Sequence, residues 1–252
     1  MDNIEKLPIY SVLKAPLDFV TLGQEIDADS ISVRFKEIAK SLFEKYYIVV
    51  CDCNDTEHLY KFAEIEFYYY KRGVLDDDIY MCTYPRTSKA GKFLWHDSGV
   101  DICFESNSDI DDYYFGGILI RSLIDENNEV IGGPGRCANE LSFLCKRGKT
   151  PDLVLRPKEK EEEISPLEDI RQGIDCDVDE NGDEKVKLCF FRDLPMEKWK
   201  KRKKTVLRMT KEGYKRTSIT YYYNDYPTSN GDRKKKVMEK KDKKAKQKIE
   251  NV

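Results

Sequence analysis

Residues 62–70 read Phe-Ala-Glu-Ile-Glu-Phe-Tyr-Tyr-Tyr, a stretch with the composition of a β-strand that nevertheless contains two carboxylates. Side chains in a strand alternate between the two faces of the sheet. One face therefore carries a polar and aromatic stripe, which consists of Phe62, Glu64, Glu66, Tyr68 and Tyr70. The other face has the character of core and consists of Ala63, Ile65, Phe67 and Tyr69. Taken alone, the stretch is most simply an amphipathic edge strand with its acids in solvent.

The same stripe has a second interpretation. A carboxylate beside tyrosines suits a site that stacks a flat ring and activates a water molecule. The stretch itself does not distinguish such a site from a solvated face, so the choice depends on the rest of the chain.

The charge of the chain is distributed unevenly along its length. Over all 252 residues, 44 Lys and Arg nearly balance 47 Asp and Glu. Residues 1–150 carry a net charge of −9 and residues 151–190 a net charge of −7, whereas residues 191–252 carry +13. A basic C-terminal quarter of this kind indicates an anionic partner.

Cysteine usage and hydropathy argue against a disulfide-stabilised protein, a metal-binding protein and a membrane protein. The chain has eight Cys and only two His, with no CxxC pair and no zinc-ligand spacing. We therefore expect reduced, structural cysteines, no metal and no cofactor. The sequence contains no long apolar run and no basic-then-apolar leader, so we expect a soluble, cytoplasmic protein without a membrane partner.

Periodicity predicts the order of the elements. An amphipathic pattern over residues 31–46 predicts a helix, and a strand at residues 46–51 is expected to form a hairpin with the opening stretch. A short helix is expected at residues 136–146. Further strands are expected at residues 92–96, 100–104, 116–124, 186–192, 205–209 and 217–223.

Together these elements predict an α+β fold. We expect a single domain over residues 1–226, built on a mostly antiparallel, strongly curved sheet that a few helices flank. Residues 156–184 are acidic and poor in apolar side chains, which predicts a surface excursion or a partly disordered insert in this domain. Residues 227–252 are rich in lysine, so we expect a disordered basic tail.

Four motifs, taken in order, resemble the alkyladenine (3-methyladenine) DNA glycosylase family. Glu66-Phe67-Tyr68 stands where that family has a Glu-Ala-Tyr signature, and residues 95–101 stand at its glycine-bearing strand. Residues 119–123, Leu-Ile-Arg-Ser-Leu, are similar to its arginine strand. Residues 133–137, Gly-Pro-Gly-Arg-Cys, are similar to the Gly-Pro-rich turn that begins a helix.

The resemblance implies excision of a damaged or modified base from DNA, without a metal or a cofactor. A glycosylase extrudes a nucleotide and holds its base by stacking and hydrogen bonds. By the match, Glu66 is the general base that activates water, Tyr68 stacks on the base, and His96 and Arg121 contribute to binding. Arg121 also has a structural interpretation, because a buried arginine needs an anionic partner and the chain has many acids. His96 likewise has a structural interpretation.

Two departures from the family keep a non-catalytic alternative open. No histidine follows the signature in residues 69–78, and Ser98 stands where the family has a bulky residue that fills the gap left by the flipped base. The chain is therefore predicted to be a monofunctional DNA glycosylase or a protein of the same fold that binds nucleic acid or a nucleobase without cleaving it. A third alternative is an intracellular protein-interaction module.

A cluster of cations near the C-terminus indicates how nucleic acid would be bound. It consists of Lys198, Trp199, Lys200, Lys201, Arg202, Lys203 and Lys204. Lysine and arginine displace counterions from a phosphate backbone, and an interleaved aromatic ring stacks on a base. We expect this cluster to bind DNA, with RNA or single-stranded nucleic acid as alternatives. The alternative is a segment that only makes the protein more soluble.

Overall fold

The computed structural model of this chain describes residues 4–17, 28–52, 54–72, 87–96, 99–143, 153–169, 188–194, 200–210 and 213–223. Residues 200–210 and 213–223 are described by the pairing of their backbones. Several predicted features lie outside the described residues, namely Ser98, Lys198, Trp199, residues 170–184 of the acidic insert and the tail at residues 227–252.

The chain begins with a short 3-10 helix, η1 (Ile4–Lys6), and then α1 (Pro8–Lys14) and α2 (Ala28–Lys45). The first hairpin pairs β1 (Tyr46–Cys51) with β2 (Glu57–Lys71). The next elements in chain order are β3 (Phe93–His96), β4 (Gly99–Cys103), β5 (Tyr114–Ile124), β6 (Val130–Gly132), α3 (Pro134–Phe143), β7 (Leu153–Pro157), β8 (Leu167–Asp169) and β9 (Cys189–Phe191). The described chain ends with β10 (Lys200–Thr210) and β11 (Gly213–Tyr223).

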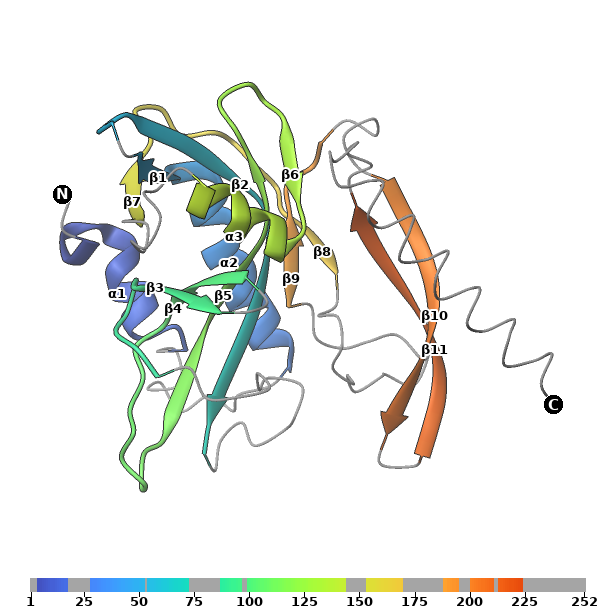
Figure 1. The fold of residues 1–252 in the computed structure, drawn as a ribbon. Coiled ribbons are helices and arrows are strands. Elements are labelled where there is room, and N and C mark those ends of the chain that lie inside the picture. The colour runs from blue at the N-terminus through green and yellow to red at the C-terminus, as the bar shows by residue number, and fades with distance from the viewer. Residues whose placement is uncertain are drawn as a thin grey trace, which may run out of the picture.

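Nine strands form one antiparallel sheet around β2. The sheet runs in the order β3-β4-β5-β2-β1-β7, while β6 pairs with β5 and β9 pairs with both β2 and β8. The sheet curls, with α2 on one side and α3 on the other (Figure 1). The predicted α+β fold with a curved antiparallel sheet is therefore confirmed. β10 and β11 form a two-stranded sheet of their own.

The main core lies between α2 and the sheet. The apolar residues of α2 recur at helical spacing and are almost completely buried; they are Ile31, Phe35, Ile38, Ala39, Leu42 and Phe43. Phe35 stacks on Phe67 of β2 with ring centroids 4.5 Å apart, and Phe190 of β9 meets Phe67 edge-on at 5.5 Å. Aromatic pairs of this kind contribute about 0.5–1.5 kcal/mol beyond the area they bury. They fix α2 against the centre of the sheet.

The interpretation of residues 62–70 as a solvated edge strand is wrong. β2 is a central strand that pairs with β1, β5 and β9, and its carboxylates Glu64 and Glu66 are only 6% and 4% exposed. Strict alternation also fails, because the register with β5 shifts on both sides of Glu64. This irregularity puts Phe62 into the same core cluster as Ile65, whereas Ala63 belongs to a separate small cluster.

The described part of the predicted acidic insert, residues 156–169, has a defined path and lies largely at the surface. Residues 156 and 157 belong to β7, which pairs with β1. The chain then crosses the C-terminal end of α2, where Lys158 is buried and the backbone N–H of Glu162 donates to the carbonyl of Glu44. Residues 167–169 form β8. The acidic composition here reflects ion pairs with neighbouring lysines and arginines rather than a lack of structure.

None of the helices in the described part of the chain is both long and apolar enough to cross a membrane. The predicted short helix is confirmed, although it begins earlier, at Pro134, directly after the Gly132-Gly133 turn. The two last predicted strands are confirmed as parts of longer ones, β10 and β11.

Candidate functional site

Arg121 joins the two carboxylates of β2. Its Nε donates to Glu64 Oε1 at 3.0 Å, and its Nη1 donates to Glu66 Oε2 at 2.7 Å. The three side chains meet because Glu66 pairs with Leu119 on β5, and Arg121 lies two residues further along the same strand. Burial alone would lower the pKa of Arg121, but the two carboxylates raise it above its ordinary value.

Glu64 makes two further contacts, which add Ser122 and Cys189 to the cluster of Glu64, Glu66 and Arg121. Ser122 Oγ donates to Glu64 Oε2 at 2.9 Å, and Cys189 Sγ lies 3.6 Å from Glu64 Oε1. Burial and the nearby Glu64 charge raise the pKa of the Cys189 and Cys137 thiols, so both stay protonated at neutral pH. These cysteines are free and buried, and they act as small core residues.

A second polar group lies further along the same face of the sheet. Tyr68 Oη donates to Asp101 Oδ2 at 2.5 Å, and His96 Nε2 lies 3.1 Å from Asp101 Oδ1. Asp101 is completely buried and Tyr68 is 1% exposed. Tyr68 reaches across β5 because Gly117 has no side chain there; a Cβ at Gly117 would lie 2.8 Å from Tyr68 Oη.

The structure thus brings the predicted residues Glu66, Tyr68, His96 and Arg121 onto one face, in two buried groups. Glu66 is held by a guanidinium, and Tyr68 is held by a carboxylate. The structural interpretation of Arg121, an ion pair with acids of the chain, is confirmed. Sequence reasoning missed Asp101, although a carboxylate within Gly-Val-Asp-Ile-Cys is a signal for a buried polar contact.

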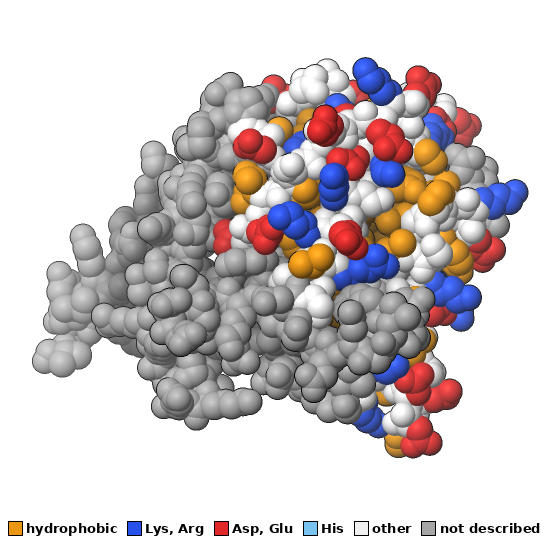
Figure 2. Space-filling model, turned by 180° about the vertical axis from the view of Figure 1, so that it is seen from behind, with side chains coloured by type: hydrophobic (Ala, Val, Ile, Leu, Met, Phe, Trp, Pro, Cys, Tyr) orange, Lys and Arg blue, Asp and Glu red, His pale blue; other side chains and the backbone are white. Residues whose placement is uncertain are grey.

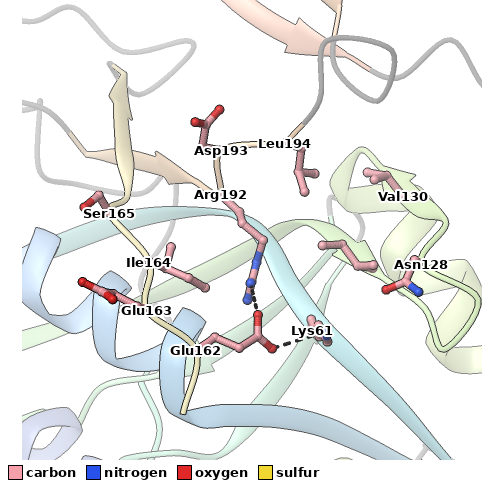
Figure 3. Close-up of a pocket in the computed structure, with 11 residues that line it drawn as sticks. Lys61, Asn128, Val130, Glu162, Glu163, Ile164, Ser165, Arg192, Asp193 and Leu194 are labelled. Atoms are coloured by element: carbon pink, nitrogen blue, oxygen red, sulfur yellow. Dashed lines mark hydrogen bonds and ion pairs between the residues drawn. The ribbon is translucent and has the colours of Figure 1, made fainter. Parts of the chain in front are cut away.

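An open hollow of about 620 Å³ lies on another part of the surface (Figure 3). It is lined by Lys61, Ile124, Asn128, Val130, Glu162, Glu163, Ile164, Ser165, Arg192, Asp193 and Leu194. A smaller hollow of about 290 Å³ lies between α1 and the end of β7. None of the four residues predicted to bind or cleave a base lines either hollow.

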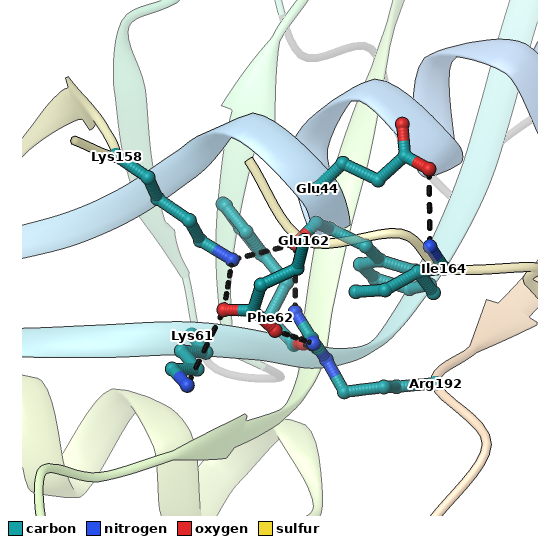
Figure 4. Close-up of polar contacts among 8 residues, drawn as sticks. Glu44, Lys61, Phe62, Lys158, Glu162, Ile164 and Arg192 are labelled. Atoms are coloured by element: carbon teal, nitrogen blue, oxygen red, sulfur yellow. Dashed lines mark hydrogen bonds and ion pairs between the residues drawn. The ribbon is translucent and has the colours of Figure 1, made fainter. Parts of the chain in front are cut away.

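Glu162, which lines the larger hollow, contacts three cations (Figure 4). Its Oε1 accepts from Lys158 Nζ at 2.8 Å and lies 3.3 Å from Lys61 Nζ, while its Oε2 accepts from Arg192 Nη1 at 2.5 Å. Lys158 and Arg192 each donate a further hydrogen bond, at 2.7 Å, to the carbonyl of Phe43 in the last turn of α2. Cations at a helix C-terminus satisfy its free carbonyls and its dipole. This network therefore caps the C-terminus of α2 and holds residues 158–164 against that end of the helix.

The cap network predicts a specific dependence of stability on pH. Burial would raise the pKa of Glu162, but hydrogen bonds from Lys158 and Arg192 lower it to about 2 from its usual 4.5. A carboxylate with a depressed pKa in the folded state stabilises the protein above pH 4.5, and this stabilisation is lost as the pH falls towards 2. We expect the difference in unfolding free energy between wild type and Glu162→Gln to be constant above that window and to shrink within it.

Urea unfolding of both proteins at a series of pH values measures this difference. Glu163→Gln is the matched control, because the side chain of Glu163 points away from Arg192 and Lys61 (Figure 3). A Glu162→Gln difference that does not change with pH would contradict the proposed role of the network.

The cationic cluster predicted at residues 198–204 lies largely in β10. The two strands of the β10–β11 ribbon contain eight Lys and Arg, four Tyr and no Asp or Glu. The antiparallel register sets five consecutive cations opposite five uncharged residues of the other strand: Lys200↔Tyr223, Lys201↔Tyr222, Arg202↔Tyr221, Lys203↔Thr220 and Lys204↔Ile219. The row of tyrosines opposite the cations was not predicted, since it follows only from this register.

No protein-family model matches the chain, and no curated protein matches it either. The resemblance to the alkyladenine DNA glycosylases rests on the four sequence motifs, and membership of that family stays a prediction. Among the described residues, no group of three or more His, Cys, Asp or Glu side chains could hold a metal ion.

Proposed function

We propose that this protein binds nucleic acid through the β10–β11 ribbon. The observation that carries the proposal is the cross-strand register, which puts a row of cations on β10 beside a row of tyrosines on β11. Lysine and arginine gain free energy on nucleic acid by releasing condensed counterions. Stacking of a base on an aromatic ring contributes a further ~1–3 kcal/mol. Residues opposite each other in this register share a face of the ribbon, so each of the three tyrosines is placed beside a cation.

The electrostatics of the rest of the chain support the same site. Residues 1–190 carry a net charge of −16, whereas residues 191–252 carry +13. On the described part of the face seen in Figure 2, basic and acidic side chains are interspersed and no large area has a single sign. An acidic body repels a phosphate backbone and a basic segment attracts it, so the charge distribution directs the nucleic acid to residues 191–252, which contain the ribbon.

Neutralising the ribbon should weaken binding more than neutralising an equal charge in the tail. The test variant changes Lys200, Lys201, Arg202, Lys203 and Lys204 to glutamine. The control variant changes Lys234, Lys235, Lys236, Lys240 and Lys241 to glutamine, so both lose the same charge. Titrated against a fluorescein-labelled oligothymidylate at constant salt, the ribbon variant should lose at least about tenfold in affinity relative to the control. Equal losses would contradict a site on the ribbon.

We rank base excision behind binding because of the contacts of Glu66. To activate a water molecule, Glu66 would need that water beside its carboxylate, in a place where Glu66 is only 4% exposed and already accepts a hydrogen bond from Arg121. We therefore expect no base release above the buffer rate in a single-turnover assay on alkylated and deaminated DNA, single-stranded or duplex. Release by the wild type that Glu66→Gln abolishes, at unchanged DNA affinity, would instead establish a glycosylase.

A further inference from the structure

The β10–β11 ribbon has two chemically different faces. Residues directly opposite each other on paired strands share a face, and successive residues alternate. We call the face that carries the even-numbered residues of β10 the even face. It consists of Lys200, Arg202, Lys204, Val206, Arg208 and Thr210 with Tyr223, Tyr221, Ile219, Thr217, Lys215 and Gly213. The odd face consists of Lys201, Lys203, Thr205, Leu207 and Met209 with Tyr222, Thr220, Ser218, Arg216 and Tyr214.

The two faces differ in charge and in apolar content. The even face carries five cations and two tyrosines, and both tyrosines lie opposite a cation at one end of the ribbon. The odd face carries three cations, and its β10 half ends in the apolar pair Leu207 and Met209. Since binding free energy from counterion release grows with the number of phosphates neutralised, the even face is the stronger nucleic-acid surface.

We infer that the even face binds single-stranded nucleic acid. This inference rests on the function proposed above and adds the face and the class of ligand. Alternate positions on one strand are about 6.8 Å apart, and the neighbouring strand is about 4.8 Å away. The even face therefore has a row of cations along β10, which can bind the phosphate backbone of the nucleic acid. Parallel to this row it has tyrosines at positions 221 and 223, on which the bases can stack.

The tyrosines are the reason for preferring a single strand over a duplex. In a duplex the bases stack on one another and present only their edges in the grooves, so a tyrosine ring cannot cover a base face. In a single strand each base can leave its neighbours and stack on an aromatic ring, whatever its identity. The affinity of the even face should accordingly depend little on the base sequence of the nucleic acid.

Charge reversal at matched positions tests which face of the ribbon binds the nucleic acid. Lys200→Glu with Lys204→Glu changes two lysines of the even face, and Lys201→Glu with Lys203→Glu changes two lysines of the odd face. Both double variants have the same net charge and the same altered segment. With the full chain and a labelled oligothymidylate, we expect the even-face variant to lose at least about tenfold more affinity than the odd-face variant. Equal weakening by both would overturn the choice of face while leaving the ribbon as the site.

Tyrosine substitutions test the class of ligand. Tyr221→Ala with Tyr223→Ala should weaken binding of the oligothymidylate at least about tenfold and leave binding of a duplex of equal length nearly unchanged. Tyr214→Ala with Tyr222→Ala is the odd-face control, and we expect it to have a small effect on both probes. Equal losses for duplex and single strand would overturn the single-strand inference. Wild-type binding that none of these variants weakens would exclude the ribbon and thus the proposed function itself.

Discussion

Replacing Arg121 with alanine is expected to destabilise the protein by about 3–5 kcal/mol, because it leaves two buried carboxylates without their cation. Glu64 and Glu66 are both less than a tenth exposed, and each accepts a hydrogen bond from the guanidinium. The midpoint of urea denaturation at neutral pH measures the loss. A compensated variant, Arg121→Met with Glu64→Gln and Glu66→Gln, should recover most of it, since no buried charge then remains.

Arg156→Ala is the matched control for this prediction. Arg156 makes a bidentate pair with Glu57, at 2.5 Å for both bonds, on the exposed surface between β7 and β2. Exposed pairs contribute only about 0–1 kcal/mol even when their geometry is good. If Arg121→Ala costs no more than Arg156→Ala, water reaches Glu64 and Glu66. That outcome would contradict a closed cluster and would restore Glu66 as a candidate for catalysis.

Gly117→Ala is expected to have the second large effect, a destabilisation of about 3 kcal/mol or more. A Cβ at this position would lie 2.8 Å from Tyr68 Oη and 2.9 Å from the carbonyl oxygen of Ile102. The contact with Tyr68 can be relieved only if Tyr68 moves, and the contact with the Ile102 carbonyl only if the pairing of β4 and β5 is disturbed. The buried carboxylate of Asp101 then loses the hydrogen bond from Tyr68. Thermal and urea unfolding both measure the change.

Gly135→Ala provides the control for this substitution. Apart from its chain neighbours and the backbone of its own helix, no atom lies within 4 Å of a Cβ at Gly135, which belongs to the first turn of α3. Alanine is the better helix former, so we expect a stability equal to the wild type or slightly higher. A similar loss in both variants would show that the cost belongs to glycine replacement in general and not to the contact between Gly117 and Tyr68.

The sequence was sufficient to predict the fold class because its strongest signals are local. The helical spacing from Ile31 to Phe43 and the aromatic, β-branched runs of β1 and β2 each fall within one element. An antiparallel sheet with flanking helices then follows from the order of these elements. The predicted edge position of β2 failed for a different reason. Whether a strand is central depends on β5 and β9, which lie far along the chain.

The burial of the two acids could not be predicted for the same reason. Carboxylates are rarely buried unless they are paired, so a local reading puts Glu64 and Glu66 in solvent. Their partner Arg121 is 57 residues from Glu64, and only the register of β2 with β5 joins them. The register also shifts beside Glu64, and Phe62 belongs to the same core cluster as Ile65, although it was predicted on the polar stripe.

The cationic cluster was visible in the sequence, but its geometry was not. A run of lysines predicts an anionic partner whatever its conformation. The pairing of β10 with β11 adds the tyrosines at positions 221–223 and divides the run between two faces. The cluster can be recognised as part of a strand only through its pairing with residues 213–223, a segment of the same length as residues 200–210.

The most direct test of the central proposal is the salt dependence of binding between the intact wild-type chain and an oligothymidylate. If the five cations of the even face each neutralise a phosphate, the logarithm of the association constant should fall linearly with the logarithm of the salt concentration, with a slope of about −3.5. A slope near this value, reduced by about 1.4 in the Lys200→Glu, Lys204→Glu variant, is the result we predict. No binding at low salt, or binding with a slope near zero, would contradict it.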